Sequence, residues 1–245
     1  NAREMLAAAL VEKDYGNRVK IVRINGFDTA WADDDLAVIA RAAPEAILLP
    51  KVNTAADVQA LAAKLDAHPE TANTKIWCMM ETPLGMLNAA EIASASPRMA
   101  GFVMGTNDLA KELNSRFRPD RLAMQTGLGL CLLAAKAYGL VAVDGGYKAF
   151  KDEDGLRVEC DQGRDMGFDG KTLIHPAQVA VANAAFAPSE AEIDLSNRQI
   201  AAFEQAEADG LGVAVVDGKI VENLHVVTAR SVLAKAAAIE AMNAE

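Results

Sequence analysis

Short apolar runs rich in β-branched residues alternate with longer alanine-rich stretches along most of this chain. The runs are nearly continuously hydrophobic, as is typical of strands in a parallel sheet whose two faces are both covered. Their alternation with helical stretches predicts βα units joined by right-handed crossovers. Strands are expected at 19–25, 46–52, 75–81, 101–105, 139–144 and 170–175, and helices between them, for example at 33–42, 55–67 and 127–138.

Six such units leave two α/β architectures open. One is an open, doubly wound sheet of six strands. The other is a TIM (β/α)₈ barrel, which needs eight units. The sequence opens on Asn1, without an initiator Met and inside an apparent helix, so the barrel interpretation expects the first two βα units to precede residue 1. We favour the barrel.

The pattern changes after residue 188. Ser189 and Glu192 have the spacing of a capping box, which predicts a helix to about residue 209. Two short apolar runs flank Asp217 and Gly218 and predict a hairpin with a type I′ turn, and a last helix is expected over 227–242. We therefore expect a barrel domain over 1–188 and a C-terminal helix–hairpin–helix appendage over 189–245 that acts as a lid or as an oligomerisation segment.

Composition excludes several classes of protein. The net charge is −10 and no Lys/Arg cluster occurs, so a nucleic-acid-binding surface is not expected. Apolar runs are too short to span a membrane, and the three dispersed cysteines suit a reducing cytoplasm rather than a disulfide framework. The GxGxxG, GxxxxGK[ST] and GxSxG motifs are absent, which argues against classical dinucleotide, P-loop and nucleophile-elbow sites.

Polar side chains, most of them ionisable, stand where several predicted strands end. In parallel α/β folds the carboxyl ends of the strands line the active site. Burying a lone charge is costly, so such groups tend to pair or to hold a metal. The residues at these positions are Arg23, Asn25, Lys51, Glu81, Asp108, Asp144, Lys171 and His175.

Glu81 and Asp108 are the candidate metal ligands of this set. Glu81 ends an apolar run, and the next residues, Thr82 and Pro83, already resemble the N-cap and first position of a helix, so the alternative role for Glu81 is a structural ion pair. Asp108 has the alternative of capping the helix that follows it. Together the two carboxylates suit Mg²⁺, which prefers one or two carboxylates plus water and substrate oxygens.

Arg23 and Lys51 are candidate substrate-binding cations. The planar guanidinium of Arg23 suits a bidentate grip on a carboxylate or on a thioester oxygen. The alternative for either side chain is a salt bridge at the rim of the barrel. His175, which precedes Pro176, fits a structural role as well as a catalytic one.

Five segments together resemble the HpcH/HpaI aldolase/citrate lyase β-subunit family of CoA-ester lyases. The resemblance extends over nearly the whole chain, and GTNDLAKEL is most similar to the branch of malyl-CoA/β-methylmalyl-CoA lyases and (3S)-malyl-CoA thioesterases. The segments are VRING (22–26), LLPKV (48–52), METPLGMLNAAEIA (80–93), GTNDLAKEL (105–113) and FDGKTLIHPAQVAVANAAFAPS (168–189).

This resemblance implies a barrel that binds Mg²⁺, with Mn²⁺ as a possible substitute, and that assembles as a homotrimer or hexamer. It implies Glu81 and Asp108 as metal ligands and Arg23 as the catalytic residue that faces the thioester. We assign substrate binding to Lys51, Gly105, Thr106 and Asn107, and proton transfer to Glu222, which stands where the family has an Asp that reaches a neighbouring active site.

Besides Glu222 in place of Asp, two further departures from the family pattern stand out. The acidic LDLEDAV-type motif of the family's second strand is absent, in agreement with the strand count. The DGVYND-like stretch of the family reads DGGYKA at 144–149, so the role of this loop is open.

The reaction implied is retro-Claisen cleavage of a malyl-CoA-type thioester to glyoxylate and an acyl-CoA, or hydrolysis of the same thioester. The alternatives are a citryl-CoA lyase-like subunit of citrate lyase, a class II pyruvate-type aldolase that does not use CoA, and a non-catalytic assembly subunit.

Overall fold

The computed structural model describes residues 1–244 and divides into two compact units. The first unit runs from Asn1 to Ala185, and the second begins at Phe186.

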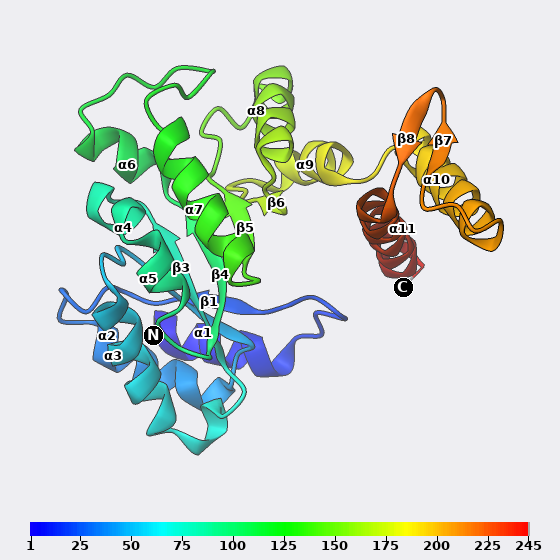
Figure 1. The fold of residues 1–245 in the computed structure, drawn as a ribbon. Coiled ribbons are helices and arrows are strands. Elements are labelled where there is room, and N and C mark those ends of the chain that lie inside the picture. Colours follow the sequence, from blue (N-terminus) through cyan, green and yellow to red (C-terminus); the bar gives the residue numbers. More distant parts are fainter. Residues whose placement is uncertain (245) are drawn as a thin grey trace. The chain divides into compact units, whose positions relative to one another are not determined.

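The first unit is built on a six-stranded parallel sheet in which the strands follow one another in chain order. A doubly wound sheet reverses its strand order at a switch point. The order here has no reversal, and the sheet curls as half of a barrel (Figure 1), so the open doubly wound alternative is wrong. The strands are β1 (Ile21–Arg23), β2 (Ala46–Leu49), β3 (Lys75–Met80), β4 (Met99–Met104), β5 (Val141–Asp144) and β6 (Gly170–Lys171).

Helices follow the strands and pack along the sheet, with contacts of α3 on β3, α7 on β4 and β5, and α8 on β6. They are α1 (Ala2–Glu12), α2 (Ala32–Ile39), α3 (Ala55–Asp66), α4 (Pro83–Leu87), α5 (Ala89–Ala93), α6 (Thr106–Glu112), α7 (Gln125–Ala137), α8 (Glu153–Met166) and α9 (Val179–Phe186). Three 3₁₀ turns complete the unit: η1 (Ala40–Ala42), η2 (Pro69–Thr71) and η3 (Pro176–Gln178).

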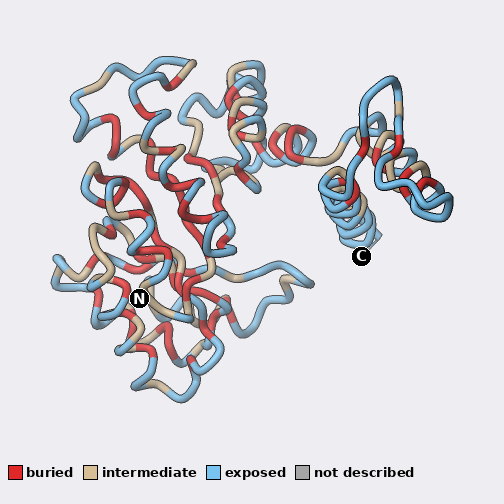
Figure 2. The backbone as a smooth tube through the Cα atoms, viewed as in Figure 1, coloured by how far each residue is buried: buried red, intermediate tan, exposed pale blue. Residues whose placement is uncertain are grey.

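The two faces of the sheet are unequally buried, unlike the even coverage expected from the sequence. Val22, Ile47 and Ile76 are in register across β1, β2 and β3, and each is 4% exposed or less because the helices cover this face. The opposite face carries Arg23 and Leu48, which are exposed and half-buried, respectively. Figure 2 shows the buried segments running along the sheet and its helices.

A buried ionic network ties the end of β5 to β6 and α8. Nη1 of Arg121 lies 2.7 Å from both carboxylate oxygens of Asp144, and Nζ of Lys171 lies 3.3 Å from Asp144 and 2.6 Å from Glu159. The side chains of Arg121, Asp144 and Lys171 are fully inaccessible to solvent. Two cations thus face two carboxylates, so the charges balance inside the fold.

The second unit is a helix, a hairpin and a helix. Ser189 caps α10 (Glu190–Ala208) through the predicted capping box. The hairpin of β7 (Ala214–Val216) and β8 (Lys219–Val221) turns at Asp217 and Gly218, whose φ angles of 50° and 74° are both positive as a type I′ turn requires. The final helix, α11 (Asn223–Asn243), begins four residues before the predicted start at 227.

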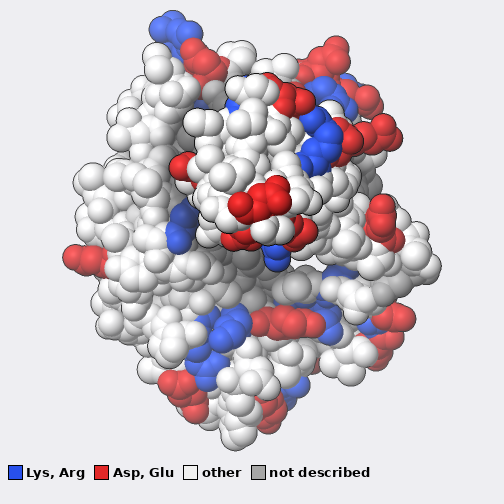
Figure 3. Space-filling view, turned by 45° about the vertical axis from the view of Figure 1, so that its right-hand side comes forward, with Lys and Arg blue, Asp and Glu red and all other residues white. Residues whose placement is uncertain are grey.

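Surface charge is mixed on the face shown in Figure 3, where acidic and basic side chains are interspersed. Of the helices in residues 1–244, none combines the length and the hydropathy needed to cross a bilayer.

Candidate active site

Glu81 follows β3 directly and is almost completely buried, with 3% of its surface exposed. Its Oε1 accepts a hydrogen bond of 2.8 Å from the backbone N–H of Lys51. Burial raises the pKa of the Glu81 carboxyl above its usual value, and the negative charge of Asp108 raises it further against the opposing effects of the Lys51 N–H and Arg23. Within residues 1–244 no cation forms a salt bridge with Glu81, so the ion-pair alternative has no partner there.

The residue that donates this hydrogen bond, Lys51, has an unusual backbone conformation. Lys51 has a φ of 51°, in the left-handed region, which costs a residue with a side chain about 1–2 kcal/mol. Such strain persists where the surrounding structure fixes it, and functional sites are a common setting. The Lys51 side chain itself is exposed and lines a cavity of 240 Å³ together with residues of the turn after β1.

The stretch after β4 packs against Glu81. A methyl group at Gly105 would overlap Cβ of Glu81 and lie 2.5 Å from its Oε2, so only glycine allows this approach. Gly105 is also the N-cap of α6, which rules out the N-cap alternative for Asp108. Asp108 lies in the first turn of α6 with its side chain exposed, at the same end of the sheet as Glu81.

Thr106 and Asn107 directly precede Asp108 in the first turn of α6. Thr106 is 2% exposed, and Oδ1 of Asn107 is buried with no hydrogen-bond partner within residues 1–244. A buried acceptor without a partner costs free energy unless a ligand or water supplies a donor. Asn107 is therefore suited to hold a hydroxyl group or water next to the carboxylates.

Arg23 ends β1 on the sheet face opposite the helices. Its Nη1 lies 3.8 Å from Sδ of Met79, and its positive charge lowers the pKa of Glu81. Arg23 makes no salt bridge within residues 1–244, so the rim salt-bridge alternative is not observed. The sheet thus brings Arg23, Glu81 and Asp108 to one end, with the guanidinium free to bind an anion.

This donor set fits Mg²⁺ better than a transition metal. No group of three or more His, Cys, Asp or Glu side chains within residues 1–244 is arranged to hold an ion. A zinc site needs three or four protein ligands. Two carboxylates, one buried and one exposed, suit Mg²⁺, which takes its remaining ligands from water and substrate.

Three residues singled out in the sequence lie elsewhere. His175 accepts the Ala177 N–H at Nδ1 over 3.1 Å and stacks on Phe150 at 4.7 Å, which favours its structural role. Asp144 belongs to the buried ionic network. Glu222 lies in the second unit as the exposed N-cap of α11, and its N–H donates to Nδ1 of His225 over 3.0 Å.

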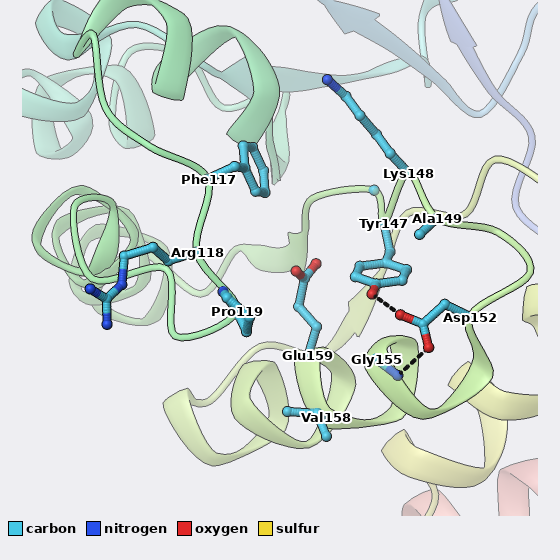
Figure 4. A pocket seen from close by; sticks show the side chains of 11 residues that line it. Phe117, Arg118, Pro119, Tyr147, Lys148, Ala149, Asp152, Gly155, Val158 and Glu159 are labelled. Carbon is cyan, nitrogen blue, oxygen red and sulfur yellow. Dashed lines mark hydrogen bonds between the residues drawn. The ribbon is translucent and has the colours of Figure 1, made fainter.

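Sequence reasoning missed a cavity of 540 Å³ between the segment after α6, the loop after β5 and helix α8 (Figure 4). The sequence left the role of the DGGYKA stretch open, and Gly146 to Ala149 of that stretch line the cavity. The sequence does contain a feature that could have indicated this cavity, namely the two pairs of an aromatic residue followed by a cation, Phe117-Arg118 and Tyr147-Lys148.

The profile of the HpcH/HpaI aldolase/citrate lyase family matches residues 1–176. The chain belongs to this family.

Its relatives in the family include both thioesterases and lyase subunits. A (3S)-malyl-CoA thioesterase of Cereibacter sphaeroides (strain ATCC 17025 / ATH 2.4.3) is 67% identical over 244 residues, covering 100% of this chain and 83% of the relative. The citrate lyase subunit beta of Leuconostoc mesenteroides subsp. cremoris is 35% identical over 250 residues, with the same two coverages. A crystal structure of CitE from Mycobacterium tuberculosis in complex with magnesium, acetoacetate and coenzyme A superposes with a TM-score of 0.77 at 30% identity, over 94% of this chain and 83% of that one.

Proposed function

We propose that this protein is a Mg²⁺-dependent enzyme that hydrolyses the thioester of (3S)-malyl-CoA or a closely similar hydroxyacyl-CoA. The observation that carries the proposal is the pairing of Glu81 and Asp108 beside the free guanidinium of Arg23. The thioesterase that is 67% identical over the whole chain supports the substrate and the reaction. Free, buried Cys78, Cys131 and Cys160 accord with a reducing compartment such as the cytoplasm.

Glu81 and Asp108 would hold the metal, with Mn²⁺ as a possible substitute for Mg²⁺. When bound, the ion would supply charge stabilisation for substrate oxygens and would lower the pKa of a bound water. The Lys51 N–H fixes the Glu81 carboxylate in one orientation. Oδ1 of Asn107 is available to accept a hydrogen bond from the substrate hydroxyl or from the attacking water.

Arg23 would bind the thioester carbonyl. No carboxylate within residues 1–244 forms a salt bridge with its guanidinium. Its hydrogen-bond donors are therefore free for the oxygen on which negative charge develops. Preorganised donors of this kind stabilise the transition state more than the ground state.

Carbon–carbon cleavage is the second candidate, because the family also contains citrate lyase beta subunits. Retro-Claisen cleavage places negative charge on the same thioester oxygen, as an enolate, so Arg23 suits both reactions. Product analysis distinguishes them. Purified protein with (3S)-malyl-CoA and Mg²⁺ should release free CoA and malate in equal amounts; acetyl-CoA and glyoxylate instead would assign the lyase, and no turnover would refute both.

Replacing Arg23 with Lys is expected to lower kcat by about 10²-fold or more and to leave the affinity for Mg²⁺ nearly unchanged. Lysine keeps the charge but loses the planar fork of donors, and an oxyanion donor is worth about 10²–10³-fold in kcat. Steady-state kinetics over a Mg²⁺ titration measures both quantities. An unchanged kcat would remove Arg23 from the reaction.

We further propose that the protein is a homotrimer or hexamer in which Glu222 transfers a proton in a neighbour's active site. The second unit has a small core of Phe203, Ala206, Ala214, Val221 and Val226 and leaves Glu222 exposed at the start of α11. The site of the first unit has a metal-ligand pair and a cation but lacks an evident free base within residues 1–185.

Mixing Glu222→Gln subunits with Arg23→Ala subunits tests this sharing. Each variant alone should be nearly inactive. If sites are shared, mixed oligomers should recover a substantial fraction of wild-type activity, because some sites then receive both intact residues. Glu204→Gln, an exposed carboxylate of α10, is the matched control and should retain full activity alone. Confirmed subunit exchange without recovery would contradict the shared site.

A further inference from the structure

The loop between β2 and α3, residues 50–54, contains the strained Lys51 whose N–H donates to the Glu81 carboxylate. A left-handed φ at a residue with a side chain is kept only where neighbouring contacts restrain it. Packing supplies only part of this restraint, because Lys51, Asn53 and Thr82 line the cavity of 240 Å³ beside the loop. The loop therefore depends on specific contacts to keep the Lys51 N–H in place.

Three contacts join this loop to α4 and to the residue that ends α4. Oγ1 of Thr82 donates a hydrogen bond of 2.5 Å to Oδ1 of Asn53. Nδ2 of Asn88 donates to the backbone carbonyl of Asn53 over 2.8 Å. A methyl group at Gly85 would overlap the carbonyl oxygen of Val52, so the first turn of α4 lies directly against the loop. These contacts fix the position of the loop relative to α4.

The bond between Asn53 and Thr82 links the same two chain segments as the bond between Lys51 and Glu81. Glu81 and Thr82 are consecutive, and Lys51 and Asn53 are two residues apart. The Asn53 side chain makes no other hydrogen bond within residues 1–244. Oγ1 of Thr82 also accepts the Gly85 N–H over 3.0 Å as the N-cap of α4. A change at Asn53 therefore breaks the link between the segments and leaves this cap in place.

We propose that Asn53 is a positioning residue of the metal site: its bond to Thr82 holds the Lys51 N–H against Glu81 and so keeps the carboxylate in the orientation that binds Mg²⁺. Asn53 acts through Lys51 and Glu81 and is not itself a ligand. Residues that orient a metal ligand in this way typically contribute about 10–100-fold in metal affinity. The inference rests on the proposed function, because it takes Glu81 as a ligand of Mg²⁺.

Titration calorimetry with Mn²⁺ alone, without substrate, tests this role. Asn53→Ala is expected to weaken Mn²⁺ binding about tenfold. In thioester hydrolysis it should raise the Mg²⁺ concentration needed for half of the maximal rate by the same factor, with kcat at saturating Mg²⁺ nearly unchanged. A residue that serves only the stability of the fold would change neither quantity.

Changes at Thr82 test the same bond from its other side. Thr82→Val removes the hydroxyl and should weaken Mn²⁺ binding as Asn53→Ala does, whereas Thr82→Ser keeps the hydroxyl and should bind as wild type. The double variant Asn53→Ala/Thr82→Val should bind Mn²⁺ no more weakly than Thr82→Val, because both changes remove one shared bond.

Thr54→Ala is the matched control. Thr54 lies in the same loop, but its hydroxyl donates to Oδ2 of Asp57 over 3.2 Å at the start of α3 and makes no bond to α4. This variant should lose some stability and keep the wild-type affinity for Mn²⁺. Urea unfolding of each variant shows that the fold is retained.

Weaker Mn²⁺ binding in Asn53→Ala and Thr82→Val, with wild-type binding in Thr82→Ser and Thr54→Ala, supports the assignment. Unchanged affinity in folded Asn53→Ala, or an equal loss in Thr54→Ala, would overturn it while leaving the proposed function intact. If the wild-type protein binds no Mn²⁺ and hydrolyses no (3S)-malyl-CoA, the proposed function fails and the positioning role fails with it.

Discussion

Replacing Glu81 with Gln is expected to lower turnover by at least about 10³-fold, equivalent to about 4 kcal/mol of transition-state stabilisation. Glutamine can still accept the Lys51 N–H hydrogen bond through its amide oxygen, so the local backbone should remain in place. It removes the buried negative charge that the proposed Mg²⁺ site requires. The matched control is Glu91→Gln, an exposed carboxylate of α5, which should retain wild-type turnover.

The same variant should keep or increase the free energy of unfolding of the metal-free protein at neutral pH. Burial raises the pKa of Glu81 in the folded state, so the folded protein holds its proton more tightly than the unfolded chain. Ionising this group therefore reduces stability as pH rises from the ordinary glutamate pKa through the raised one. A glutamine at position 81 does not ionise, so the variant does not lose stability in this way. Urea unfolding of both proteins between pH 4 and pH 8 measures it; a clear loss of stability in Glu81→Gln, with turnover retained, would make Glu81 a structural residue.

Replacing Asp144 with Ala is expected to destabilise the protein by about 3–5 kcal/mol, the usual effect of breaking a buried ion pair. The substitution leaves the buried Arg121 and Lys171 cations without the carboxylate that both contact. Nη2 of Arg121 already lacks a hydrogen-bond partner within residues 1–244, so the guanidinium has little alternative bonding.

Glu204→Ala is the control for this second prediction. Glu204 pairs with Arg230 over 3.1 Å on the surface of the second unit, and exposed pairs contribute about 0–1 kcal/mol. Chemical denaturation followed by circular dichroism measures both variants. A loss for Asp144→Ala no larger than that for Glu204→Ala would show that the network contributes little to stability.

Most of the sheet was predictable because each strand is a compact apolar run. Two strands are less than half as long as predicted: β1, predicted over 19–25, spans Ile21–Arg23, and β6, predicted over 170–175, spans only Gly170–Lys171. Leu173 and Ile174 are apolar, but the Ile174 N–H donates to Oε1 of Gln178 rather than to a neighbouring strand, and the side chain of Ile174 is exposed. Hydropathy carries no information about that side-chain hydrogen bond, so the end of this strand could not be predicted.

The placement of the candidate residues at one end of the sheet was predictable, whereas their contacts were not. Strand ends identified Arg23 and Glu81, because parallel strands present their carboxyl ends together. The role of Gly105 as the contact surface for Glu81, and the strained turn at Lys51, depend on the register of neighbouring strands. The ionic network depends on Arg121, a loop residue that contacts Gln162 across 41 residues of sequence, a distance that local patterns do not reach.

The most direct measurement of the central claim is the rate of free-CoA release from (3S)-malyl-CoA as a function of Mg²⁺ concentration, in the wild type and in Asp108→Asn. The proposed site predicts that a chelator abolishes the wild-type rate and that Mg²⁺ restores it along a saturable curve. It also predicts that Asp108→Asn, which loses one of the two ligand charges, needs at least about tenfold more Mg²⁺ for half of its maximal rate. A full rate in the presence of chelator, or identical Mg²⁺ curves for the two proteins, would contradict the claim that Glu81 and Asp108 form the metal site of this enzyme.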